Sequence, residues 1–181
     1  MINLCKSWFA VDKRILGIYR IFLGILVFAD ILRRWDVRHI FYSNNGIVYH
    51  YKSSYFSLLN MFDFQLWMID LFFIIGMFFS ILLILGYKTK LSHLISGIIL
   101  ISLHNKVILV ENAGDFVMNC MIIWTFFLPL GSAISLDSLK LSLKNLNDSN
   151  TTDLNHEINY PNYQYYSIAY FAILFQISAI Y

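Results

Sequence analysis

The sequence is poor in charged residues, and this sets it apart from soluble proteins. Of its 181 residues 13% are charged, whereas 59% are hydrophobic and 18% aromatic; an average soluble domain is about 25% charged. The formal net charge is only +2, and the basic residues lie beside apolar runs, so we expect no binding of nucleic acid. The composition predicts an integral membrane protein.

Cysteine and proline are scarce as well, with two residues of each. Cys5 lies near the N-terminus and Cys120 lies inside an apolar run, so the sequence predicts neither a disulfide framework nor a metal site. The first residues carry no signal-peptide cleavage pattern and lead directly into an apolar run of full length.

The sequence contains several long apolar runs. A helix that crosses a membrane needs about 20 mostly apolar residues. We predict one all-α membrane domain over residues 1–181, a multi-pass transmembrane bundle with about five spans. The predicted spans are 15–35, 64–85, 91–110, 113–130 and 165–181. Gly86 is expected to end the second span, because glycine commonly terminates helices.

Two stretches interrupt the predicted bundle. Residues 36–63 form an aromatic-rich loop that we expect to lie against one end of it. Residues 145–162 are polar and rich in asparagine, which predicts a disordered linker. The last apolar run stops at Tyr181 without a polar flank, so we expect a truncated chain that lacks a C-terminal part or a partner subunit.

The distribution of basic residues favours one orientation. More lysines and arginines lie in the predicted loops on the side of the N-terminus than in the loops on the other side. Because cytoplasmic loops are enriched in basic residues, this predicts a cell-membrane protein with a cytoplasmic N-terminus.

Several polar residues lie in or beside the predicted spans, and an intramembrane charge is a functional candidate by default. The candidate ligand-binding residues are Arg20, Asp30, Asp70, His104, Asn105, Asn112 and Asp115. Estimated depths predict that Asp30, Asp70 and the His104–Asn105 pair converge in the outer half of the bundle. Arg20 is expected about 15 Å deeper than Asp30. Each charge could instead be a satisfied packing device.

A polar turn separates the third and fourth predicted spans. Residues 111–115, with the sequence ENAGD, can survive beside lipid only where they face water or protein. We expect Asp115 to cap the following helix and Asn112 to hydrogen-bond the carbonyl of a lipid-soluble ligand. No catalytic residue can be named from this pattern.

Six segments, taken in order, suggest a family. They are Arg14–Gly24, Phe41–Gly46, Asn112–Asp115, Phe127–Gly131, Ser135–Asp137 and Phe175–Tyr181. Together they resemble the HTTM-domain (horizontally transferred transmembrane domain) proteins, bacterial membrane proteins related to the vitamin K-dependent γ-carboxylases. The resemblance implies a helical membrane fold, and reduced vitamin K or another quinone as ligand. Apart from the resemblance, no cofactor is identified.

The resemblance also implies what this chain lacks. The carboxylases use a lysine that follows a segment resembling residues 176–181, and the chain ends before it. Ala113 stands where the carboxylases have the histidine of an Asn-His pair, and alanine cannot accept a proton. The resemblance therefore implies an N-terminal fragment that is inactive alone. Two alternatives remain open: a small transporter or channel subunit, and a structural subunit of a larger membrane complex.

Overall fold

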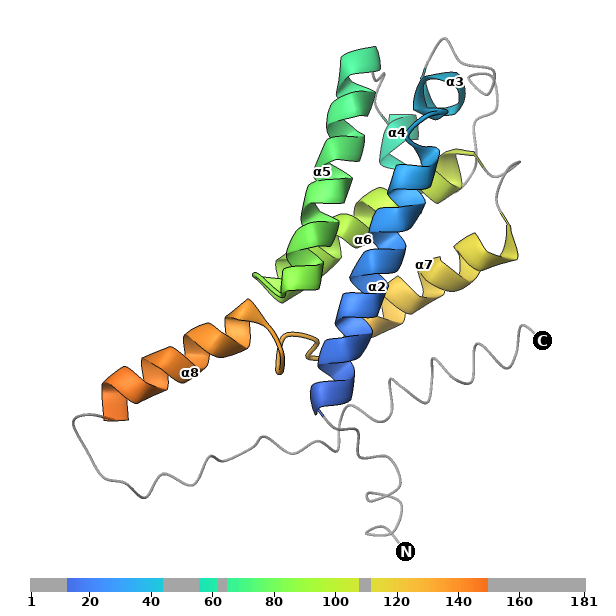
Figure 1. The fold of residues 1–181 in the computed structure, drawn as a ribbon. Coiled ribbons are helices and arrows are strands. Elements are labelled where there is room, and N and C mark those ends of the chain that lie inside the picture. Colours follow the sequence, from blue (N-terminus) through green and yellow to red (C-terminus); the bar gives the residue numbers. More distant parts are fainter. Residues whose placement is uncertain (1–12, 44–55, 62–64, 108–111, 150–181) are drawn as a thin grey trace, which may run out of the picture.

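A computed structural model describes residues 13–43, 56–61, 65–107 and 112–149. These residues form seven helices and no strand, which confirms the all-α prediction for this part of the chain. The helices are α2 (Lys13–Arg34), α3 (Arg38–Tyr42), α4 (Leu58–Met61), α5 (Leu66–Leu85), α6 (Thr89–Lys106), α7 (Ala113–Thr125) and α8 (Leu136–Ser149) (Figure 1). The predicted span at 165–181 lies outside the described residues.

Two of the described helices are long and apolar enough to cross a membrane, α2 over Arg14–Arg34 and α5 over its whole length. The sequence predicts four spans in this part of the chain, and these two helices are the ones that meet the length and composition of a span. Helix α7 has 13 residues, which give about 20 Å at 1.5 Å per residue, short of the roughly 30 Å hydrocarbon core. Helix α6 ends at Lys106 and is much less hydrophobic than α5 because histidines and serines interrupt it.

The core forms where α2 packs along α5 and α5 packs along α6. Gly24 allows the first of these contacts, because a Cβ atom there would lie 2.6 Å from Ile84 Cγ1 and 3.2 Å from Ile84 N. The following core side chains are completely buried: Leu23, Val27, Ile31, Ile69, Phe73, Leu100 and Leu103. Tight helix packing through a glycine is common between membrane helices.

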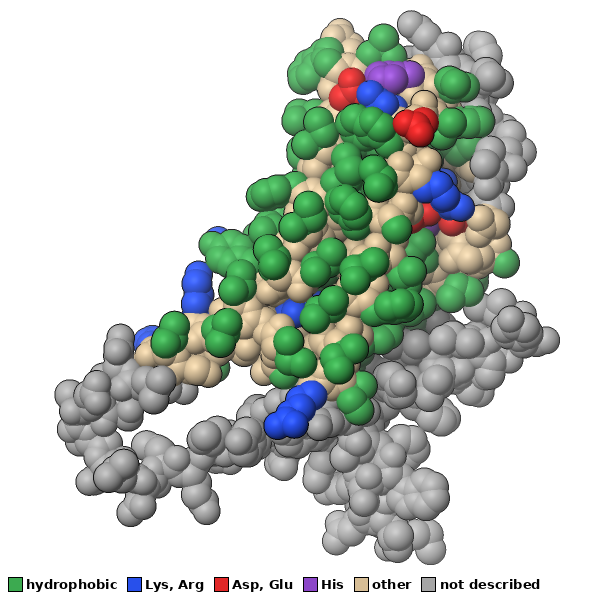
Figure 2. Space-filling view, in the orientation of Figure 1, with side chains coloured by type: hydrophobic (Ala, Val, Ile, Leu, Met, Phe, Trp, Pro, Cys, Tyr) green, Lys and Arg blue, Asp and Glu red, His purple; other side chains and the backbone are tan. Residues whose placement is uncertain are grey.

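The outward faces of α2 and α5 are also apolar. On α2 the exposed side chains include Ile15, Ile18, Phe22, Ile25 and Leu32, and on α5 they include Leu66, Trp67, Leu71, Ile74, Phe78, Ile81 and Leu85. Figure 2 shows hydrophobic side chains over this face and charged side chains mainly toward its two ends. A helix that is apolar on all sides is either enclosed by protein or surrounded by lipid.

The end of α5 follows the sequence-based expectation. Gly86 lies in the left-handed region with φ of 71°, and its N–H donates to the carbonyls of Leu82 and Leu83. Helix α6 begins only three residues later. Lys88, which precedes it, also has a positive φ, of 43°, a conformation that is uncommon outside glycine.

Helix α8 was not predicted, and it includes residues 145–149, where the sequence predicts the start of a linker. Leu136, Leu139 and Leu143 recur at helical spacing, but the polar residues between them hide this pattern in the composition. All three leucines are exposed. In Figure 1, α8 leaves the bundle near the end of α5 and projects away from it.

Candidate functional site

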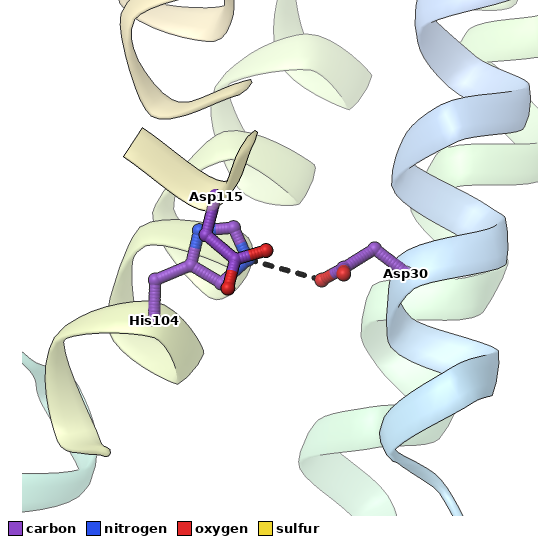
Figure 3. A group of neighbouring side chains, drawn as sticks. All are labelled: Asp30, His104 and Asp115. Carbon is purple, nitrogen blue, oxygen red and sulfur yellow. Dashed lines mark hydrogen bonds and ion pairs between the residues drawn. The ribbon is translucent and has the colours of Figure 1, made fainter. Parts of the chain in front are cut away.

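Three titratable side chains meet where the ends of three helices come together. Asp30 comes from α2, His104 from α6 and Asp115 from the first turn of α7 (Figure 3). His104 Nε2 lies 3.0 Å from Asp30 Oδ2 and 3.9 Å from Asp115 Oδ1. Their exposed fractions are only 0% for His104, 6% for Asp30 and 3% for Asp115. We call these three residues the acid–base network.

Two consecutive arginines bind the carboxylates of the network. Arg34 Nε lies 2.9 Å from Asp30 Oδ2, and Arg34 Nη2 lies 2.9 Å from Asp115 Oδ2. Arg33 Nη2 lies 2.8 Å from Asp30 Oδ1 and 3.4 Å from Asp115 Oδ1. The Arg34 side chain is 9% exposed, whereas that of Arg33 is 59% exposed. Arg34 therefore lies inside the protein, and Arg33 lies between the network and the surface.

The charges of these groups cancel except for that of the histidine. Two carboxylates balance two guanidinium groups, so the protonation of His104 decides whether the cluster is neutral or carries one positive charge. A buried cluster that is neutral in one state and singly charged in the other can hold a proton at a moderate electrostatic cost.

The hydrogen bonds of His104 define two protonation states. Its Nδ1 lies 2.7 Å from Asn119 Oδ1, and its Nε2 faces the Asp30 carboxylate. With an acceptor oxygen at each ring nitrogen, this arrangement is satisfied by an imidazolium, in which both nitrogens donate. If the Asn119 amide turned over, its NH₂ group would donate to Nδ1, and His104 would be neutral with its proton on Nε2. Each state satisfies both ring nitrogens.

The same three side chains could offer ligands to a metal ion, because their ligand atoms all lie within 4.8 Å of one another. However, Arg34 already binds both carboxylates. A divalent cation would have to displace this guanidinium or lie beside it, and like charges repel strongly in a buried site. The geometry therefore suits a proton better than a metal ion.

The turn before α7 differs from its predicted roles. Asn112 is the N-cap, since its Oδ1 accepts from Asp115 N at 3.1 Å, and Asp115 Oδ2 accepts from Asn112 N at 3.2 Å. This is a capping box, in which the third helical residue returns the hydrogen bond of the cap. Asp115 therefore takes part in the cap as expected, but from the third helical position and not as the N-cap residue, and it also belongs to the acid–base network.

Two further candidates lie apart from the network. Asp70 forms ion pairs with Arg38 and with His39, whose Nε2 lies 3.1 Å away. Asn105 donates through Nδ2 to the backbone carbonyl of Phe56 at 2.7 Å. Of the four side chains expected to converge, the structure thus brings together two, the aspartate of α2 and the histidine of α6.

Arg20 is completely buried at the other end of α2. Its Nη2 donates to the carbonyls of Ile84 at 3.2 Å and Ile134 at 2.7 Å. The first carbonyl is one of the last four of α5, which have no partner within their own helix. Ile134 has φ of 51°, a rare conformation for a β-branched residue. Arg20 also packs on Gly86, where a Cβ atom would overlap its Nη1.

Asp137 completes this second site of buried polar contacts. Its carboxylate accepts hydrogen bonds from Lys88 N at 2.9 Å, Thr89 N at 2.8 Å and Thr89 Oγ1 at 2.8 Å. Partial burial acts to raise the pKa of Asp137, but the hydrogen bonds from Thr89 and Lys88 outweigh it and hold the pKa below its usual value. Asp137 therefore caps α6 from a distant part of the chain.

Three residues of the site are absent from the sequence-based candidates: Arg33, Arg34 and Asn119. A signal for the last two is visible: Arg34 follows Asp30 by four residues, and Asn119 follows Asp115 by four. Residues four apart lie on the same face of a helix.

The part of the chain that the structure describes is all-α, with two helices that could cross a membrane and a buried acid–base network. No known protein family matches this chain, and no curated protein or solved structure is similar to it. The resemblance to the HTTM-domain proteins thus stays a prediction.

Proposed function

We propose that this chain is a multi-pass protein of the cell membrane whose acid–base network binds and releases one proton during proton-coupled transport. The observation that carries the proposal is the position of His104, which is completely buried and hydrogen-bonded through both ring nitrogens. Ionisable residues inside membrane bundles commonly mark proton pathways.

The exposed surface supports the membrane location. The outward face of α2 and α5 is apolar between two ends that carry charge (Figure 2). One end carries Arg33 and Arg38, and the other carries Lys88 and Lys90. Charged side chains at both ends of a long apolar surface suit the two headgroup layers of a bilayer. The proposed orientation has a cytoplasmic N-terminus, which places the network near the outer side.

Arg33 gives the network a route to water. Its side chain is 59% exposed and lies against both carboxylates. A change of its rotamer would open the network to water. Nε2 keeps its proton and faces Asp30 in both states, so the proton that is gained and lost is the one on Nδ1. It is present while Asn119 Oδ1 accepts from Nδ1, and it is absent when the amide turns and donates instead.

Proton flux into proteoliposomes tests the proposal. A pH-sensitive dye inside the vesicles reports uptake driven by an imposed membrane potential. The Asp30→Asn variant removes the charge that faces His104 Nε2, and its flux should fall by about tenfold or more, because the imidazolium loses the carboxylate that stabilises it.

Asp70→Asn is the matched control, because Asp70 lies in the other membrane-length helix and pairs outside the network. Its flux should stay close to that of the wild type. Equal loss in both variants, or wild-type flux no greater than that of empty vesicles, would contradict proton transport through this network.

A quinone-type ligand is a second candidate, and the position of Asn112 favours it. Asn112 is exposed, and its capping bond uses the amide oxygen, so the amide nitrogen can donate to a carbonyl. The Asn112→Ser variant keeps a good cap and removes that donor. A quinone analogue should then bind more weakly by about 1–3 kcal/mol, and unchanged binding would exclude this role for Asn112.

A further inference from the structure

A cavity lies at the opposite end of the bundle from the acid–base network. It has a volume of about 480 Å³ and lies between the turn joining α5 to α6, the end of α7 and residues 128–132. This volume is within the range of sites that hold small molecules, roughly 300–1,000 Å³. Its wall includes Lys88, Lys90, His93, Phe126, Leu128 and Ser132.

The polar part of the wall suits an anion. Lys88 and Lys90 are exposed, and the left-handed conformation of Lys88 is of the kind found at ligand sites. Ser132 Oγ is buried and has no hydrogen-bond partner among the described residues. The acidic residue of the wall, Asp137, already accepts three hydrogen bonds. Two cationic residues and one unused hydroxyl thus belong to the wall of the cavity.

The rest of the wall is apolar. Leu128 and Leu130 are buried, whereas Leu91 is 46% exposed and Phe126 is 37% exposed. Phe126 stacks with His93 at a centroid distance of 6.0 Å. The apolar wall therefore continues onto the outer surface, so a ligand with a hydrocarbon chain could extend out of the cavity along it.

We infer that this cavity binds the phosphate headgroup of an anionic phospholipid, with the phosphate at Lys88, Lys90 and Ser132 and the start of an acyl chain along Leu91 and Phe126. The inference rests on the proposed membrane location. The cavity lies at the end of α5, where the exposed apolar face gives way to basic residues, which is the depth of lipid phosphates in a bilayer.

Lipid titration of the detergent-solubilised protein tests the inference. Short-chain phosphatidylglycerol is the probe, and short-chain phosphatidylcholine and inorganic phosphate are compared with it. Phosphatidylglycerol should bind more tightly than either. The Lys88→Asn/Lys90→Gln variant should weaken its binding by about tenfold or more, because each cation near a lipid phosphate contributes about 1 kcal/mol. Asparagine at 88 tolerates the left-handed backbone.

Lys140→Gln/Lys144→Gln is the matched control, because it removes two charges from neighbouring α8 without changing the cavity wall. Its affinity should stay within about twofold of the wild-type value, since neither lysine lines the cavity and solvent screens exposed charges. If both double variants lost affinity for phosphatidylglycerol equally, the lipid would be bound by general electrostatic attraction and not by this cavity. That result would overturn the inference. Inorganic phosphate that binds as tightly as the lipid, or phosphatidylcholine that does so, would also overturn it.

The Ser132→Ala variant keeps the test decisive if the double variant fails to fold. It removes only the unpartnered hydroxyl, and affinity for phosphatidylglycerol should fall by several fold, as for one lost hydrogen bond to a charged group. Unchanged affinity would overturn the inference, because the phosphate was placed at this hydroxyl. These titrations measure lipid binding and do not depend on proton flux. A negative result would therefore not affect the proton-transport proposal, and a negative result for Asp30→Asn would not affect the lipid site.

Discussion

Arg20 and Asp30 are both buried charges of helix α2, and their partners are of different kinds. Arg20 donates to two backbone carbonyls. Asp30 lies among side chains, with His104 and two arginines as partners. Backbone carbonyls neither titrate nor change rotamer, so Arg20 is fixed in one state. The partners of Asp30 can gain a proton, turn over or move, so that end of the helix can adopt two states.

The kind of partner, backbone or side chain, distinguishes a structural charge from a functional one. Burial alone does not distinguish them. Arg20 and His104 are both completely buried. Arg20 holds the end of α5 against the segment that leads into α8, and any residue lacking its donors would loosen that contact. His104 can exist in two hydrogen-bonded forms, which a purely structural residue does not need. The following predictions test this contrast.

The largest expected effect comes from removing Arg34. Arg34→Met leaves Asp30 and Asp115 buried without their enclosed partner, and breaking a buried ion pair in this way costs about 3–5 kcal/mol. The neighbouring Arg33 binds the same two carboxylates but is 59% exposed, so Arg33→Met should cost less than about 1 kcal/mol. Denaturant unfolding in detergent micelles measures both. If both variants lost the same free energy of unfolding, burial of the arginine would not determine the strength of its ion pairs.

Removing Arg20 should have the next largest effect. Arg20→Met keeps the apolar stem but leaves the carbonyls of Ile84 and Ile134 without their donor, which should lower the free energy of unfolding by about 1–3 kcal/mol. Proton flux per folded molecule should not change, because Arg20 lies apart from the network. A flux that falls as steeply as in Asp30→Asn would give Arg20 a functional role and break the contrast between the two ends.

The cap of α7 should have a smaller effect. Asn112→Ala removes the N-cap side chain, which should cost about 0.5–2 kcal/mol, whereas Asn112→Ser should cost only a fraction of that. Thermal unfolding of the three proteins side by side measures the difference. If alanine and serine were equally destabilising, the capping bond seen at Asp115 N would contribute nothing to stability.

The smallest effect concerns pH and Asp137. Its pKa in the folded protein lies below the value for the unfolded chain, about 3.9, because Thr89 and Lys88 donate to the carboxylate. It therefore contributes stability that is complete above the unfolded value and is lost as pH falls through the folded one. Asp137→Asn should remove this contribution and make unfolding less dependent on pH in the acidic range. If the free energy of unfolding of the variant depended on acidic pH as in the wild type, that dependence would come from other carboxylates.

Much of the fold follows from the sequence, for stated physical reasons. The bounds of α5 were predicted within two residues at each end, because a long apolar run ends at a glycine that can adopt positive φ. The ends of α6 and α7 were missed by several residues, since apolar composition continues past the point where the helices stop. Helix α8 was missed because its leucines are diluted by polar neighbours.

The site could be predicted only in part. Depth along each helix is fixed by residue count, so the level shared by Asp30 and His104 can be estimated from sequence. Which faces meet depends on how helices rotate against one another, and sequence spacing does not determine this. That rotation directs Asp70 to Arg38 and brings Asp115 to Arg34 instead.

The most direct measurement follows the protonation of His104 in lipid bilayers by NMR of its two ring nitrogens across a pH series. The account predicts one exchange between an imidazolium with both nitrogens protonated and a neutral ring with its proton on Nε2. In Asp30→Asn the imidazolium should be less populated at each pH, because the facing carboxylate is gone, whereas Arg20→Lys should match the wild type. A His104 ring that keeps one protonation state from acidic to alkaline pH in the folded protein would contradict the central claim.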